Sequence, residues 1–172
     1  MSKINILLVG ATGVGKSTLI NAVLGEELAE TGVGKSVTKE LKIYENDALD
    51  IRLIDSRGFE NGTIEDKAFT KEGDKWTDGG KLGENEDRIL HLIWYCMDNN
   101  SKRVFNPHLK AIENITKVWK EVPIIIVLTK ASNMNDARES IKMMEDAIAE
   151  YDKDRNKLNV KAMVPVTALP TE

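Results

Sequence analysis

The chain has 172 residues, of which 41% are apolar and 30% are charged, so it can bury the core of one globular domain but is short for two. A formal net charge of −4 and a pI near 5.4 exclude a broad basic surface of the kind that binds nucleic acid or acidic lipid. The single cysteine, Cys96, excludes an internal disulfide, and no signal peptide or membrane-spanning run is recognisable. We therefore expect a cytoplasmic protein of one domain.

Apolar runs and helical stripes alternate along the chain. Short runs that are apolar on both faces are typical of strands buried between helix layers, and apolar residues at helical spacing indicate amphipathic helices. The alternation predicts an α/β fold, with a mostly parallel six-stranded sheet, helices on both faces, and ligands bound beyond the carboxyl ends of the strands. The expected elements are a strand at 4–9, a helix at 16–24, strands at 41–44, 51–54 and 89–97, a helix from 106, a strand at 123–129, a helix at 136–151 and a strand at 160–166.

The hexapeptide TGVGKS occurs twice, at 12–17 and again at 31–36. A phosphate-binding loop needs a strand before it and a helix after it, so that successive backbone N–H groups surround the anion. The first copy meets both conditions and completes the pattern G-x-x-x-x-G-K-[ST] over 10–17. The second copy has Ala29 where the first has Gly10, and a strand follows it. We therefore interpret the second copy as a flexible loop and the first as a nucleotide site.

Four further motifs follow the first loop. They are V-T-K-E at 37–40, D-S-R-G at 55–58, L-T-K-A-S at 128–132 and V-T-A at 166–168. In this order the motifs make the chain resemble the P-loop GTPases of the translation-factor class, especially the Era-, TrmE- and dynamin-like branch, over essentially its whole length. The resemblance implies the three-layer, Ras-like P-loop NTPase fold, with the last helix of that fold missing from this chain.

The resemblance also implies the residues that bind Mg²⁺ and GTP or GDP. Lys16 would contact the β- and γ-phosphates, while Ser17, Thr38 and Asp55 would hold Mg²⁺. The N–H of Gly58 would meet the γ-phosphate, so catalysis is assigned to Lys16, Thr38 and Gly58. The expected nucleotide-binding set is Gly10, Thr12, Gly13, Val14, Gly15, Lys16, Ser17, Thr18, Thr129, Lys130, Thr167 and Ala168.

We interpret residues 1–172 as one GTPase domain, cut before its last helix. Within it, 25–40 corresponds to switch I and 55–87 to switch II with a long flexible insert. The polar, glycine-rich segment 59–87 is of the kind that is usually functional or disordered. Loss of the γ-phosphate would release the Thr38 loop and the second segment, and so change the surface that a partner meets.

The base-reading motif departs from the GTPase pattern. Ser132 stands where N/T-K-x-D has an aspartate that accepts two hydrogen bonds from guanine, and a neutral hydroxyl does not replace a bidentate carboxylate. Asp136, in the following turn, is a weak candidate to replace it. Thr129 and Lys130 still fit the motif, so GTP is the expected ligand and ATP the alternative.

The catalytic position departs as well. Phe59 follows D-S-R-G where Ras-like proteins have a water-orienting glutamine, and Gly13 stands where some relatives place a potassium-binding asparagine. Arg57 could supply a positive charge in cis, although a solvated arginine is the simpler interpretation. Because an arginine finger contributes roughly 10³–10⁵ in rate, we expect slow hydrolysis by the isolated domain.

The predicted function is therefore a GTP-binding, slowly hydrolysing switch that acts on an unidentified protein effector. The alternative from another class is a nucleotide-binding interaction module that does not turn over. A nucleotide-dependent dimer is a further expected partnership, and membrane association is expected only through a region after residue 172. Charge indicates no nucleic-acid partner.

Overall fold

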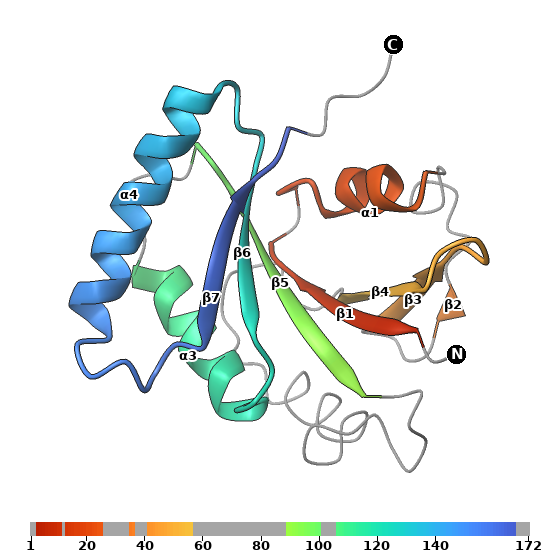
Figure 1. Ribbon diagram of the computed structural model, residues 1–172, viewed down its shortest axis with the longest axis horizontal. Helices are drawn as coiled ribbons and strands as arrows, with labels where there is room; N and C mark the ends of the chain where they lie inside the picture. The colour runs from red at the N-terminus through yellow and green to blue at the C-terminus, as the bar shows by residue number, and fades with distance from the viewer. Residues whose placement is uncertain are drawn as a thin grey trace.

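A single sheet with helices on both faces forms the described part of the chain (Figure 1). The computed structural model describes residues 3–11, 13–25, 35–36, 41–56, 89–100 and 106–167. Within these ranges the sheet has seven strands in the order β2-β3-β4-β1-β5-β6-β7. The elements are β1 (Ile4–Val9), α1 (Lys16–Leu24), β2 (Lys35–Ser36), β3 (Leu41–Glu45), β4 (Ile51–Ser56), β5 (Leu90–Asp98), α3 (Asn106–Val118), β6 (Ile124–Thr129), α4 (Met134–Tyr151) and β7 (Val160–Pro165).

Strand pairing confirms the mostly parallel sheet. β1 pairs in parallel with both β4 and β5, and β5, β6 and β7 continue in parallel. Among the described strands the antiparallel pairs are β2–β3 and β3–β4, and β3 and β4 form the predicted hairpin-like pair. The carboxyl ends of the five strands that pair in parallel therefore meet at one edge, which is the edge where the first TGVGKS copy lies.

The seventh strand, β2, was not among the six predicted. It is the Lys35–Ser36 pair at the end of the second TGVGKS copy, and it pairs antiparallel with Ile43 and Lys42 of β3. Two residues are too few to leave an alternating apolar pattern, so only the pairing reveals the strand. The two copies thus have different structures after their lysine, because the first leads into a helix and the second lies in a strand.

The core has two parts, one on each face of the sheet. Leu7 and Val9 of β1 pack in the part that contains α3 and residues of α4, whereas Ile6 and Leu8 pack in the part that contains α1. This alternation follows from the two-residue period of a strand, and it makes β1 apolar on both faces, as predicted. Figure 1 shows α1 on one side of the sheet and α3 and α4 on the other.

On the face of the sheet that carries α1, side chains of β5, β6 and β7 are more exposed to solvent than those on the face that carries α3 and α4. Ile124 and Ile126 of β6, which face α3 and α4, have no exposed surface, whereas Ile125 between them is half-buried. Trp94 of β5 is also half-buried, and Val164 of β7 is 42% exposed.

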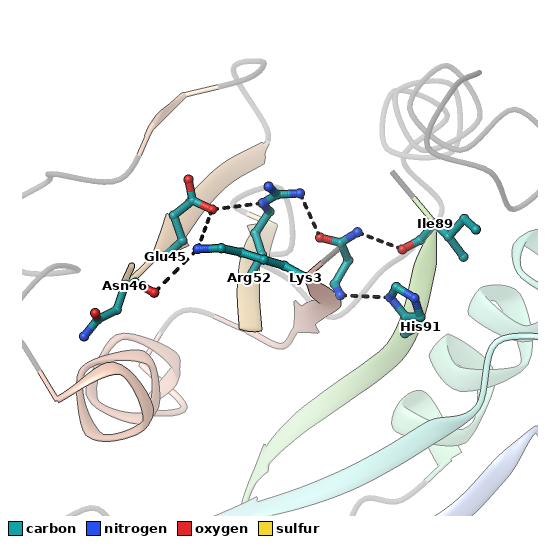
Figure 2. Close-up of polar contacts among 7 residues, drawn as sticks. Lys3, Glu45, Asn46, Arg52, Ile89 and His91 are labelled. Carbon is teal, nitrogen blue, oxygen red and sulfur yellow. Dashed lines mark hydrogen bonds and ion pairs between the residues drawn. The ribbon is translucent and has the colours of Figure 1, made fainter. Parts of the chain in front are cut away.

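A polar network fixes the other end of β1, away from the glycine loop (Figure 2). Asn5 is fully buried, and its side-chain amide donates to the carbonyl of Ile89 at 2.8 Å while its Oδ1 accepts from Arg52 at 3.2 Å. Its backbone N–H donates to Nδ1 of His91 at 3.0 Å, at the point where the β1–β5 register shifts. Asn5 therefore links β1 to both β4 and β5.

Charged residues extend this network to β3. Arg52 pairs with Glu45 at 3.2 Å, and Lys3 pairs with the same carboxylate oxygen at 3.3 Å (Figure 2). Partial burial on its own would raise the pKa of Glu45, but the contacts with Arg52 and Lys3 outweigh it and lower that pKa. The network thus connects four adjacent strands, β3, β4, β1 and β5, at the end of the sheet opposite the glycine loop.

Replacing Asn5 with alanine should destabilise the fold by about 1–3 kcal/mol, because the fully buried Asn5 side chain makes hydrogen bonds to the Ile89 carbonyl and to Arg52 that alanine does not replace. Urea unfolding followed by circular dichroism measures the change. The control is Asn156→Ala at an exposed position, which should stay within about 0.5 kcal/mol of the parent chain. Equal losses for the two variants would contradict the role given to Asn5.

The thiol of Cys96 should be inert in the folded protein. Cys96 is 1% exposed, and burial raises its pKa to about 12 because the thiolate loses solvation. Since it is the single cysteine of the chain, its reaction with a chromogenic disulfide reagent reports on one site. We expect negligible reaction at about pH 8 in buffer and complete reaction in urea. Rapid reaction of the folded protein would contradict this burial.

The same raised pKa makes stability depend on pH. Above the ordinary thiol pKa of about 8.5, Cys96 loses its thiol proton in the unfolded chain but keeps it in the native protein. The contribution of Cys96 to stability is therefore complete below about pH 8.5 and declines as pH rises from there toward about 12. Urea unfolding at about pH 7 and about pH 10 should show a smaller loss in Cys96→Ala than in the parent chain.

Candidate functional site

The loop between β1 and α1 depends on glycine at two positions. A Cβ atom on Gly10 would lie 2.7 Å from the carbonyl oxygen of Cys96 in β5, so a larger residue would displace the backbone. Gly15 has φ of +99°, in the left-handed region, and directly precedes α1. The N-cap residue, Gly15, has no side chain that could cap the first turn of α1, so the N–H groups and partial positive charge of this turn can face an anion.

Two residues at the end of β6 contact this loop. The hydroxyl of Thr129, a residue that is 4% exposed, donates to the carbonyl of Val14 at 2.5 Å. The ammonium of Lys130 donates to the carbonyl of Gly13 at 2.8 Å. The fold thus brings the L-T-K-A-S motif against the first TGVGKS copy, although more than 110 residues separate them.

Lys130 has a second partner that the sequence did not indicate. Its ammonium lies 3.3 Å from Oδ2 of Asp98, the last residue of β5, and its backbone has a positive φ of 59°. The other oxygen of Asp98 accepts the N–H of Asn100 at 2.8 Å, which orients the carboxylate. The signal that could have identified Asp98 is an acidic residue at the carboxyl end of a buried strand.

Lys16 and Asp55 form an ion pair at the start of α1. Their closest charged atoms lie 3.3 Å apart, and each side chain is 12% exposed. The Lys16 ammonium also donates to the carbonyl of Ser56 at 2.9 Å. Ser56 is itself fully buried, and its hydroxyl donates to the carbonyl of Leu8 at 2.8 Å. Both contacts of Lys16 therefore come from the end of β4.

The carboxylate of Asp55 has the properties of a cation ligand. Its Oδ1 is buried and accepts no hydrogen bond from any described residue, because the ion pair with Lys16 lacks hydrogen-bond geometry. In the described ranges no three His, Cys, Asp or Glu residues gather into a metal cage. Mg²⁺ prefers hard oxygen ligands and usually takes only one or two carboxylates besides phosphate and water. The donor set of Asp55 and the exposed Ser17 hydroxyl fits that ion.

The position of the missing guanine-reading aspartate is occupied by an exposed hydroxyl. Ser132 is exposed, and its oxygen accepts from the side-chain amide of Asn133 at 3.3 Å. Asn133 in turn caps α4 by accepting the N–H of Asp136. Asp136 uses one carboxylate oxygen to accept from the buried amide of Asn99 at 2.6 Å. In the structure this contact attaches α4 to the end of β5.

The V-T-A motif lies beside L-T-K-A-S. The hydroxyl of Thr167 donates to the carbonyl of Ala131 at 2.5 Å, and the N–H of Val166 donates to the carbonyl of Leu128 at 2.8 Å. The fold therefore places L-T-K-A-S and Asp55 of D-S-R-G against the segment 13–16, and V-T-A beside L-T-K-A-S. The predictions for Thr12, Thr38, Gly58, Phe59 and Ala168, and for most of 25–40 and 55–87, lie outside the described residues.

Known proteins share both the sequence pattern and the fold. The family model of the 50S ribosome-binding GTPases matches residues 5–130. Cell division control protein 10 of Saccharomyces cerevisiae is 27% identical over 145 residues, which cover 70% of this chain and 45% of that protein. GTPase Era of Clostridioides difficile is 28% identical over 166 residues, which cover 95% of this chain and 50% of that protein. The chain spans about half the length of these relatives.

A solved structure supports the fold at low sequence identity. The small COPII coat GTPase SAR1 of Encephalitozoon cuniculi, in complex with GDP, matches with a TM-score of 0.61 at 15% identity over 98% of this chain and 71% of that chain. At this identity the likeness concerns the fold alone. Because the family model covers well over half of the sequence, the chain belongs to the 50S ribosome-binding GTPase family and has the Ras-like P-loop fold.

Proposed function

We propose that this chain is a Mg²⁺-dependent switch domain that binds GTP and hydrolyses it slowly to GDP and phosphate. One observation carries the proposal: Thr129 and Lys130 of the base-side motif donate to the carbonyls of Val14 and Gly13 in the phosphate loop. A strand end that reads the base and a loop that binds the phosphates can contact the same nucleotide only if they lie next to each other, and these two segments are joined by hydrogen bonds. Membership of a GTPase family supports a guanine nucleotide as that ligand.

In this proposal the phosphates lie against the start of α1. Backbone N–H groups from Gly13 to Thr18 surround the anion, and Lys16 exchanges its protein partners for phosphate oxygens. Ser17, Thr38 and Asp55 would hold Mg²⁺, which neutralises charge on the phosphates when it is bound. Gly58 would present its N–H to the γ-phosphate. Thr38 and Gly58 would thereby couple 25–40 and 55–87 to the state of the nucleotide.

Slow hydrolysis follows from Phe59, because an aromatic side chain does not orient a water molecule by hydrogen bonds. The effector, a nucleotide-dependent dimer and a cytoplasmic location belong to the same proposal. In the described part of the chain no helix is long and apolar enough to cross a membrane. Membership of this family favours neither ATP specificity nor a loss of hydrolysis. Phosphate release measured in a single turnover, once with GTP and once with ATP, separates the alternatives: the proposal expects slow release with GTP and none with ATP.

Nucleotide titration tests which TGVGKS copy binds phosphate. Lys16→Ala should weaken Mg²⁺-GDP binding by at least about tenfold, since a charge-assisted contact to phosphate is lost. Lys35→Ala makes the same change in the second copy, where the lysine lies in β2, and should leave GDP binding unchanged. Competition against a fluorescent GDP analogue gives both affinities. Equal loss in the two variants, or none in Lys16→Ala, would refute the assignment.

Restoring the absent carboxylate should restore guanine reading. Ser132→Asp should increase the preference for GDP over inosine diphosphate, which lacks the exocyclic amine, by about tenfold, because a bidentate carboxylate senses that amine. The control, Ser132→Asn, adds a side chain of the same shape without the charge and should gain much less. Competition titrations of the two nucleotides measure the preference, and equal gains in both variants would contradict this reading of position 132.

A further inference from the structure

We propose that Asp98 is a positioning residue of the nucleotide site, which fixes the Lys130 side chain across the glycine loop and so prepares it to contact the nucleotide. The inference rests on the proposed function of the same site, in which Lys130 is one of the nucleotide-binding residues. Asp98 belongs to none of the motifs on which that proposal depends, so its role follows from its contacts alone.

The backbone of Lys130 is held on both sides. The carbonyl of Thr129 accepts the N–H of Asn99 at 2.8 Å, and the N–H of Ala131 donates to the carbonyl of Val166 at 3.3 Å. Between these bonds Lys130 has a φ of 59°, which is uncommon for a residue other than glycine and persists where surrounding contacts hold it. The start of the side chain is therefore fixed, and only its flexible methylene stem and ammonium can change orientation.

The far end of the Lys130 side chain has two partners. Its ammonium donates to the carbonyl of Gly13 at 2.8 Å and lies 3.3 Å from Oδ2 of Asp98. Because the side chain is 50% exposed, water competes for the ammonium, and the carboxylate adds the attraction of an opposite charge. The methylene stem therefore runs from the end of β6 to the glycine loop.

The carboxylate of Asp98 has a defined orientation of its own. Asp98 lies beside Thr129 in the register of β5 and β6, and its side chain is 24% exposed. Its Oδ1 accepts the N–H of Asn100 at 2.8 Å, and this bond directs Oδ2 toward Lys130. The fold thus fixes both the carboxylate and the backbone that carries the ammonium.

Fixing this side chain should increase nucleotide affinity. Lysine has more rotamer freedom than most residues, and a ligand that contacts a freely rotating lysine must order it, which reduces affinity. The ion pair with Asp98 orders Lys130 through the fold instead. Since the ammonium is bonded to the protein, the part of Lys130 that a nucleotide contacts is the methylene stem. An apolar stem makes no hydrogen bonds to a base, so the gain should not depend on which base is bound.

A direct contact between Asp98 and the base is the competing explanation. A carboxylate accepts hydrogen bonds from the exocyclic amine of guanine, which Ser132 does not replace. Such a contact would favour GDP over inosine diphosphate, which lacks the amine, and it would not depend on Lys130. Base preference and dependence on Lys130 therefore separate the two roles.

Competition against a fluorescent GDP analogue, with Mg²⁺ present, measures the affinities of GDP and inosine diphosphate. Asp98→Asn keeps an acceptor for Asn100 but removes the charge, and it should weaken both nucleotides by about threefold, since a partly exposed ion pair contributes modestly. In the Lys130→Met background the same substitution should change either affinity by less than about 1.5-fold. Lys110→Met is the matched control, because Lys110 is 57% exposed and pairs with Glu113, and it should leave both affinities unchanged.

A conservative variant separates the charge of Asp98 from its shape. Asp98→Glu keeps the carboxylate, which the flexible lysine can follow, and should lose less affinity than Asp98→Asn. If the shape of the side chain mattered instead of its charge, the order would be reversed, because asparagine has the shape of aspartate. That reversed order would contradict a role through the Lys130 ammonium.

The remaining outcomes are equally decisive. An unchanged affinity of Asp98→Asn, an equal loss with and without the Lys130 ammonium, or a loss confined to GDP would overturn the inference while the proposed function stands. A parent chain that binds neither nucleotide would overturn the proposed function and the inference with it. Circular dichroism verifies folding, and Asp98→Ser, which removes the same charge, replaces the asparagine variant if that protein does not fold.

Discussion

Parallel pairing of β1 with both β4 and β5 is the constraint on which the site depends. It centres the glycine loop at the carboxyl edge of the sheet, between strands that arrive from distant parts of the sequence. β4 places Asp55 against Lys16, and β5 places the Cys96 carbonyl so close to Gly10 that no Cβ atom fits. β6 then places Thr129 against the loop itself. With a different strand order, these motifs would not contact one another.

Charge in the site is organised in two pairs. Lys16 is paired with Asp55 at the start of α1, and Lys130 is paired with Asp98 after β6. The first pair is largely buried, whereas half of the Lys130 side chain is exposed, so solvent weakens the second pair more. This arrangement lets two like charges, those of Lys16 and Lys130, lie near one loop, because each has its own carboxylate partner.

The departure from the family pattern at position 132 leaves the architecture of the described residues intact. Ser132 is exposed and Asp136 is engaged with Asn99, so the acidic residue that follows the motif serves to attach α4. The fold tolerates the change at 132 because the side chain there supports no other element. Thr129, by contrast, is buried and bonded to the loop, so the part of the motif that has a structural role is the part that is retained.

The sequence by itself determined the local features of this protein: the strand–loop–helix unit at Gly10–Ser17, the order of the motifs, and element bounds that differ from the structure by one or two residues. These depend on periodicity and turn chemistry between near neighbours in the chain. Only the tertiary structure decided that β2 exists, that Lys130 pairs with Asp98, and that Lys16 pairs with Asp55. Each of these contacts joins residues on different strands or helices, and a linear pattern carries no information about which side chain a neighbouring strand will bring within reach.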